Sequence, residues 1–193
     1  MRATTAWAAG YTFGHRTTPS AASRSGRRAA AALAALLIAA ALVSQGKSLA
    51  AEPVAVAVAD FDYIDTSGEV ADQAAAHRAR VAAFGELLRD RIAAGGGYRI
   101  VRLDCAGSAC TAAAMAPDDF VAAARRAGAR LVVYGGIRKM STLVQWGEIQ
   151  LLDLSRDELL LRRTVTFRGD TDDAFRHAAA FVGDNVKGAM PPP

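Results

Sequence analysis

The spacing of apolar residues changes repeatedly along residues 53–187, and no other feature constrains the fold as strongly. In residues 53–61 (PVAVAVADF) valine alternates with alanine, a pattern typical of a buried strand. In residues 70–94 apolar side chains recur every three or four positions, which predicts a helix with one apolar face. The same reasoning predicts strands at 53–61, 98–103, 129–137, 141–153 and 158–168, and helices at 70–94, 117–127 and 171–187.

The resulting order, β-α-β-α-β-β-β-α, predicts an α/β fold with a mixed sheet. The first three strands are joined through helices, and such crossovers imply parallel pairing. The last two are joined by a short turn at residues 155–157, which is typical of an antiparallel hairpin. We therefore expect a single α/β domain at residues 51–188, with helices covering the sheet, and a disordered proline-rich tail at residues 189–193.

The first fifty residues are typical of an exported protein. Arg27 and Arg28 precede an apolar run from Ala29 to Val43, and small residues follow at Ser48 and Ala50. A basic flank, a short apolar run and a small-residue site predict a signal peptide after a disordered n-region, with cleavage near Ala50/Ala51. The run has 15 residues, whereas a helix needs about 20 to span a bilayer, which disfavours the alternative of a retained membrane anchor. We expect a periplasmic or secreted protein that contacts the membrane only through an uncleaved leader.

Charge is divided unevenly between this leader and the rest of the chain. Residues 1–50 carry six of the 23 Lys and Arg residues and none of the 19 Asp and Glu residues. Residues 51–193 therefore carry 17 basic against 19 acidic side chains, a net charge of −2, although the whole chain has +4. The folded part lacks the basic surface that nucleic acid requires, so we exclude a nucleic-acid partner.

Cys105 and Cys110 are the only cysteines. In an exported protein, two cysteines so close in sequence predict a structural disulfide. An alternative is a thiol-disulfide protein that uses the same pair, but such proteins favour two intervening residues at a helix start. No nearby histidine completes a zinc site.

Aspartates cluster where the first strand ends, at Asp60, Asp62 and Asp65. A buried strand followed by Asp-x-Asp resembles the first motif of haloacid-dehalogenase-type phosphatases, and residues 169–173 (GDTDD) resemble their later Mg²⁺-binding motif. This is the basis of an alternative function, a small Mg²⁺-dependent phosphohydrolase that uses Asp60 and Asp62. The structural interpretation is that the aspartates accept backbone hydrogen bonds and that Thr171 caps the last helix.

The remaining chemistry-bearing residues indicate no catalytic site. His77 and His177 are predicted to lie on solvated helix faces, and there is no G-x-S-x-G motif. Trp146 is expected on the more polar face of its strand, where an exposed tryptophan suits binding, or else at the edge of the core. The candidate binding surface comprises Asp60, Asp62, Asp65, Lys139 and Trp146.

Several short motifs resemble the amino-terminal domain of TolB and its relatives. They are residues 56–61 (VAVADF), 97–101 (GYRIV) and 128–136 (GARLVVYGG). More closely, residues 60–67 (DFDYIDTS) and 138–141 (RKMS) are similar to a family of exported bacterial proteins of unknown function. The resemblance implies a TolB-like fold that binds other envelope proteins without catalysis. TolB's own partners are not implied, because no β-propeller repeats follow this domain.

Together these observations predict an exported, non-catalytic binding or protein-interaction domain. We expect its partner to be another cell-envelope protein or a small ligand. We predict no catalytic residues, no metal and no cofactor.

Overall fold

The computed structural model describes residues 52–105, 107 and 109–193, so the predicted leader and its cleavage site lie outside the described residues. The strands are β1 (Val54–Val58), β2 (Asp62–Asp65), β3 (Tyr98–Val101), β4 (Leu131–Ser141), β5 (Val144–Asp153) and β6 (Glu158–Arg168). The helices are α2 (Ala74–Ala93), α3 (Pro117–Arg126) and α4 (Asp172–Ala189).

The strands of the described residues form one mixed sheet in the order β3-β1-β4-β5-β6, which confirms the predicted fold class. β1 pairs in parallel with both β3 and β4, as expected for crossovers through helices. β4, β5 and β6 pair antiparallel, and the turn between β5 and β6 falls at the predicted place.

β2 is a strand that the sequence did not predict. Residues 62–69 fall between the predicted strand at 53–61 and the predicted helix at 70–94, but Asp62–Asp65 pairs in parallel with β4 beyond the end of β1. Its sequence, DYID, contains two aspartates, which are depleted in strands. The long strand β4 overrides this preference by offering backbone partners from Gly136 to Lys139.

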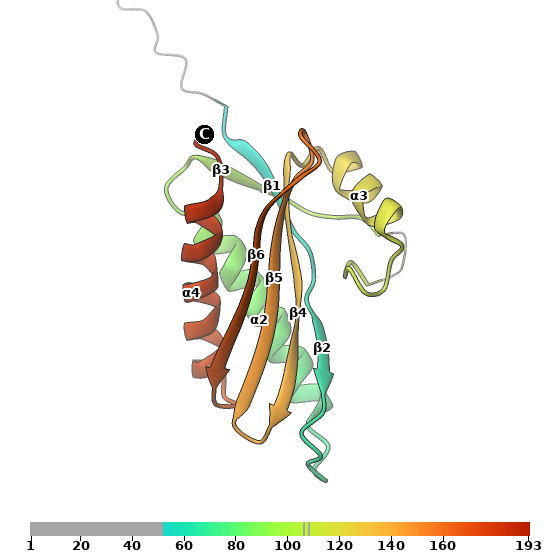
Figure 1. The fold of residues 1–193 in the computed structure, drawn as a ribbon, viewed down its shortest axis with the longest axis vertical. Coiled ribbons are helices and arrows are strands. Elements are labelled where there is room, and N and C mark those ends of the chain that lie inside the picture. The colour runs from blue at the N-terminus through green and yellow to red at the C-terminus, as the bar shows by residue number, and fades with distance from the viewer. Residues whose placement is uncertain (1–51, 106, 108) are drawn as a thin grey trace, which may run out of the picture. The chain divides into compact units, whose positions relative to one another are not determined.

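Two layers of helix cover the sheet on opposite faces. α2 and α4 lie side by side against one face (Figure 1) and enclose the larger core with alternate residues of the central strands. α3 packs on the other face, where Phe120 and Ala124 contact Ala57 and Val132. β1 is buried on both faces for this reason. None of the helices in the described ranges has the length and apolar content needed to cross a bilayer.

The start of α2 and the segment after α4 differ from the prediction. α2 begins at Ala74, four residues later than expected. At the other end, Met190 is buried against the core, and the Tyr98 hydroxyl donates a hydrogen bond to the carbonyl of Pro191 at 2.9 Å. The tail predicted to be disordered is therefore held against the domain by contacts that its sequence does not reveal.

Candidate functional site

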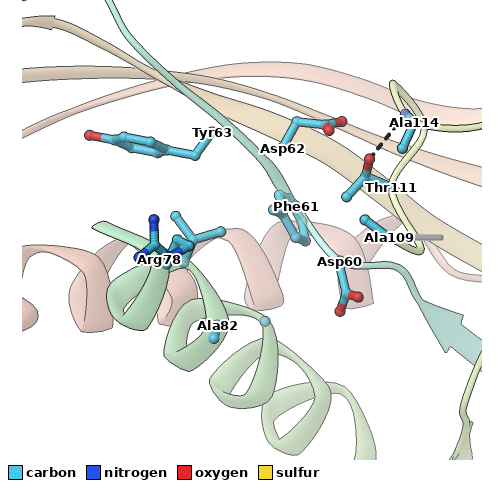
Figure 2. A pocket seen from close by; sticks show the side chains of 11 residues that line it. Asp60, Phe61, Asp62, Tyr63, Arg78, Ala82, Ala109, Thr111 and Ala114 are labelled. Carbon is cyan, nitrogen blue, oxygen red and sulfur yellow. Dashed lines mark hydrogen bonds between the residues drawn. The ribbon is translucent and has the colours of Figure 1, made fainter. Parts of the chain in front are cut away.

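A groove of about 570 Å³ lies between α2 and the loop that contains the two cysteines. We call it the α2 groove. Its lining comes from residues 60–63 after β1, from the α2 residues Arg78, Val81, Ala82 and Gly85, and from Ala109, Thr111 and Ala114 of the loop (Figure 2). The side chains of Phe61 and Val81 are buried, so the lining has an apolar floor.

The two aspartates at this groove are occupied by hydrogen bonds within the fold. Arg89 donates to Asp60 at 3.1 Å and to the carbonyl of Val58 at 2.9 Å. The Asp62 carboxylate accepts from the backbone N–H of Ala113 at 3.2 Å. In Figure 2 the two carboxylates point in different directions, that of Asp62 toward the loop. Each aspartate therefore fastens a neighbouring segment to the end of β1.

Arg78 is the charged group of the groove that has no partner among the described residues. It is exposed on the first half of α2 and lines the groove beside Tyr63 (Figure 2). Within the part of the chain that the structure describes, its guanidinium makes no hydrogen bond or ion pair. A guanidinium offers five donors in a planar fork that matches a carboxylate, so Arg78 suits an anionic group on a ligand.

Lys139 does not lie on a binding surface, contrary to the prediction. Its side chain is 0% exposed and lies on the core face of β4, in step with Leu131, Val133 and Ile137. Its ammonium lies where β2, β4 and the segments just before α2 and α4 meet. The apolar environment that buries Lys139 makes an ionic partner necessary.

Lys139 obtains partners from three segments. Its Nζ donates to Asp170 at 2.7 Å, to Gln73 at 3.3 Å and, over a shorter distance, to Glu69. Asp65 lies 4.0 Å from the same atom. We call this group of residues, together with His77 and Arg80, the Lys139 cluster.

Asp170 is the centre of the Lys139 cluster. It is 10% exposed and is contacted by His77 Nε2 at 2.8 Å and by Arg80 Nη1 at 2.7 Å, in addition to Lys139. Arg80 also pairs with Asp172 at 3.0 Å. The cluster therefore ties the amino-terminal turn of α2 to that of α4.

The pKa values in the Lys139 cluster favour its charged forms. Burial alone would raise the pKa of Asp170, but hydrogen bonds from His77 and Lys139 outweigh it and hold the pKa below its usual value. Burial alone would lower the pKa of Lys139, and its bonds to Asp170 and Glu69 raise it instead. Burial, followed by the nearby charge of Asp170, raises the pKa of Tyr63 to about 12.

His77 was predicted to lie on a solvated helix face, and that prediction is wrong. The ring is 3% exposed and contacts Tyr63 with ring centroids 4.7 Å apart. His77 precedes Val81 by four residues, so it belongs to the buried stripe of α2. His177, in contrast, is exposed.

The two phosphatase-like motifs do not form one site. Asp170 binds His77 at the start of α2, whereas Asp60 binds Arg89, twelve residues further along the same helix. Twelve residues of helix correspond to about 18 Å. Thr171 caps α4 by accepting from the Ala174 N–H at 3.2 Å, which confirms the structural interpretation of this segment.

The other predicted site residues lie outside the α2 groove. Asp65 is part of the Lys139 cluster and accepts hydrogen bonds from Ser67, which lower its pKa. Trp146 is half-buried on the sheet face away from α2 and α4, between Arg138 and Thr166 of the adjacent strands. The candidate surface predicted from sequence is thus divided among three places.

Cys105 and Cys110 are at bonding distance, with their sulfur atoms 2.13 Å apart. Cys105 is buried, and the loop between the pair borders the α2 groove through Ala109. Across residues 52–105, 107 and 109–193, no three His, Cys, Asp or Glu side chains are arranged to hold a metal ion.

A family model matches the chain to proteins of unknown function. The model of the family DUF3280, described as "Protein of unknown function (DUF2380)", matches residues 54–186. No curated protein is significantly similar to this chain.

Several solved structures are similar to this chain at low identity. The PelC dodecamer from Paraburkholderia phytofirmans shares 16% identity over 72% of this chain and 90% of that one, with a TM-score of 0.44. TolB from Acinetobacter baumannii shares 15% over 72% of this chain and 28% of that one, with a TM-score of 0.44. The LpoB C-terminal domain from Salmonella enterica shares 16% over 67% and 91%, with a TM-score of 0.40.

Proposed function

This chain belongs to the DUF3280 family, whose function is unknown, and we propose that it is an exported, non-catalytic binding domain whose ligand occupies the α2 groove. The observation that carries this proposal is the composition of the groove. An apolar floor made by Phe61 and Val81 lies beside Arg78, whose charge is unpaired among the described residues. Concave apolar sites with few polar groups are typical of ligand binding.

Export rests on the sequence of the leader and on the cysteine pair. The basic flank, the apolar run at residues 29–43 and the small residues Ser48 and Ala50 support cleavage near Ala50/Ala51. The bonding distance between Cys105 and Cys110 supports an oxidising compartment, since disulfides persist outside the cytosol.

The hydrogen bonds of Asp60 and Asp62 weigh against the phosphohydrolase alternative. The nucleophile and the proton-transferring acid must converge on one phosphoryl group, whereas the Asp60 carboxylate pairs with Arg89 and that of Asp62 turns toward Ala113 of the loop. The check is hydrolysis of an aryl phosphate with Mg²⁺ present, by wild type and Asp60→Asn. We expect no turnover by either protein; turnover that Asp60→Asn abolishes would restore the enzyme hypothesis.

Ligand binding can be tested with 1-anilinonaphthalene-8-sulfonate, a fluorescent probe with apolar rings and one negative charge. The full-length gene is expressed, and the protein is purified from the periplasm as wild type, Ala82→Glu and Ala83→Glu. Ala82 is exposed and lines the groove, and a glutamate there stands four residues after Arg78, where it pairs with the guanidinium. Ala83 is also exposed on α2 but lines a different cavity, next to α4, so its variant controls for charge and helix propensity.

We expect saturable fluorescence enhancement with wild type and Ala83→Glu, and at least about tenfold weaker binding to Ala82→Glu. Near-ultraviolet circular dichroism checks that all three proteins are folded, because the dye also binds partly folded chains. Equal binding by the two variants, or none by wild type, would contradict the proposal.

A further inference from the structure

The outer edge of β2 carries unused backbone hydrogen-bonding groups. The N–H of Thr66 donates to the carbonyl of Lys139 at 2.9 Å, and Asp62 and Ile64 lie in step with Thr66 along the strand. In a parallel pair the groups of alternate residues face the partner, so those of Tyr63 and Asp65 face away from β4. In the described ranges, no strand pairs with β2 on that side.

The residues just before β2 already bond to another segment of the chain, which is bent and turned at residues 111–115. Just before β2, the N–H of Asp60 donates to the carbonyl of Cys110 at 2.9 Å, and the N–H of Ala113 donates to the Asp62 carboxylate. The loop at residues 110–113 thus runs beside residues 60–62. Beyond it the edge of β2 continues along the α2 groove, which Tyr63 lines.

Side chains of an added strand would enter the groove with a defined spacing. Tyr63 and Asp65 point toward α2, and Asp62 and Ile64 point to the opposite face of the sheet. A strand paired to β2 alternates in the same way, with about 7 Å between successive side chains on one face. One such side chain would lie on the apolar floor at Phe61 and Val81, and the next on that face would come near Arg78.

We propose that the ligand of the α2 groove is an extended segment of a partner polypeptide that adds as a strand to the outer edge of β2. It places an apolar side chain on the groove floor and a carboxylate, two residues away, on Arg78. Strand addition of this kind takes its affinity from main-chain hydrogen bonds and its specificity from pockets for alternate side chains. The inference rests on the proposed function, since it specifies the chemistry of the same groove.

The test uses random dodecapeptides displayed on phage and selected on the periplasmic wild-type protein, with counter-selection on Ala82→Glu. We expect enriched sequences in which an apolar residue and an acidic residue are two positions apart. A synthetic peptide of the enriched sequence should bind wild type and Ala83→Glu equally and Ala82→Glu at least about tenfold more weakly.

N-methylation of single peptide amides identifies the binding mode. Methyl groups at alternate positions should reduce affinity about tenfold or more, because they remove the donors that face β2, and those at the intervening positions should have little effect. Hydrogen exchange at the amides of Tyr63 and Asp65 should slow when the peptide binds.

Three outcomes would overturn the inference. The first is a selection in which no sequence binds wild type better than it binds Ala82→Glu. The second is an enriched peptide whose affinity N-methylation changes at neither set of alternate positions. The third is a homodimer in solution that Ala82→Glu dissociates, which would assign the edge to a second copy of this chain. If the dye binds in the α2 groove but no peptide does, the proposed function stands and only this inference fails. If neither dye nor peptide binds, the proposed function and the inference both fail.

Discussion

Replacement of Lys139 by methionine tests the interpretation of the Lys139 cluster. Methionine keeps the length and the apolar stem of the side chain, so the core face of β4 stays filled. What is lost is the ammonium and its bonds to Asp170, Gln73 and Glu69. Asp170 is 10% exposed and then lacks one of its three cationic or imidazole partners.

The expected cost follows from the burial of this pair. Removal of one partner from a buried ion pair typically costs 3–5 kcal/mol, because the other charge is left without compensation. His77 and Arg80 remain bound to Asp170, so we expect the low end, about 3 kcal/mol of unfolding free energy. For a domain of this size that corresponds to a decrease in Tm of about 10 °C.

The assay is urea unfolding followed by circular dichroism at pH 7, with Arg138→Met as the control. Arg138 is the neighbour of Lys139 in β4 but is exposed on the opposite face. Surface changes of this kind usually stay within about 0.5 kcal/mol. A cost for Lys139→Met below about 1 kcal/mol, or equal to that of Arg138→Met, would refute the claim that the Lys139 cluster ties α2 to α4.

Three further predictions concern pH, the cysteines and the cap of α4. Because folding lowers the pKa of Asp170, its carboxylate stabilises the fold at pH values above the ordinary pKa of 3.8, and this stabilisation is lost as the pH falls through the lowered pKa. Urea unfolding at pH 6 and at pH 3 should therefore show a larger decrease in unfolding free energy for wild type than for Lys139→Met. Replacement of both Cys105 and Cys110 by serine should cost about 2 kcal/mol in the same assay, and reduction of wild type should add the mass of two hydrogens; unchanged stability would contradict a structural disulfide. Thr171→Ala should cost about 1 kcal/mol through loss of the cap, which differential scanning calorimetry would detect.

The sequence predicts those elements whose local residue preferences match the conformation they adopt in the fold. The alternation in β1, the hairpin turn at Asp157 and the cap at Thr171 are local signals, and the structure confirms each of them. Asp157 has φ of 52°, a conformation that aspartate tolerates better than most residues.

The missed features depend on contacts between distant segments. β2 forms because β4 continues past β1, which the four residues DYID do not indicate. Asp170 lies 93 residues from His77 and 31 from Lys139, and no local pattern joins them.

For two residues whose predicted location was wrong, the spacing of apolar residues indicates the buried position. Lys139 is in step with the core residue Ile137, and His77 is in step with Val81. A polar residue at a position where the pattern expects an apolar one can mark a buried polar cluster, and need not mark the end of the element. The free guanidinium of Arg78, in contrast, follows only from the completed fold.

The most direct test of the proposed function is native mass spectrometry of the wild-type and Ala82→Glu proteins, each isolated from the periplasm of its own host. We predict a wild-type chain cleaved near Ala50/Ala51 that carries a bound ligand, and an Ala82→Glu chain cleaved at the same place without it. An uncleaved chain retained in the cytoplasm would contradict export. A bound mass that is identical in both proteins would contradict the α2 groove as the binding site.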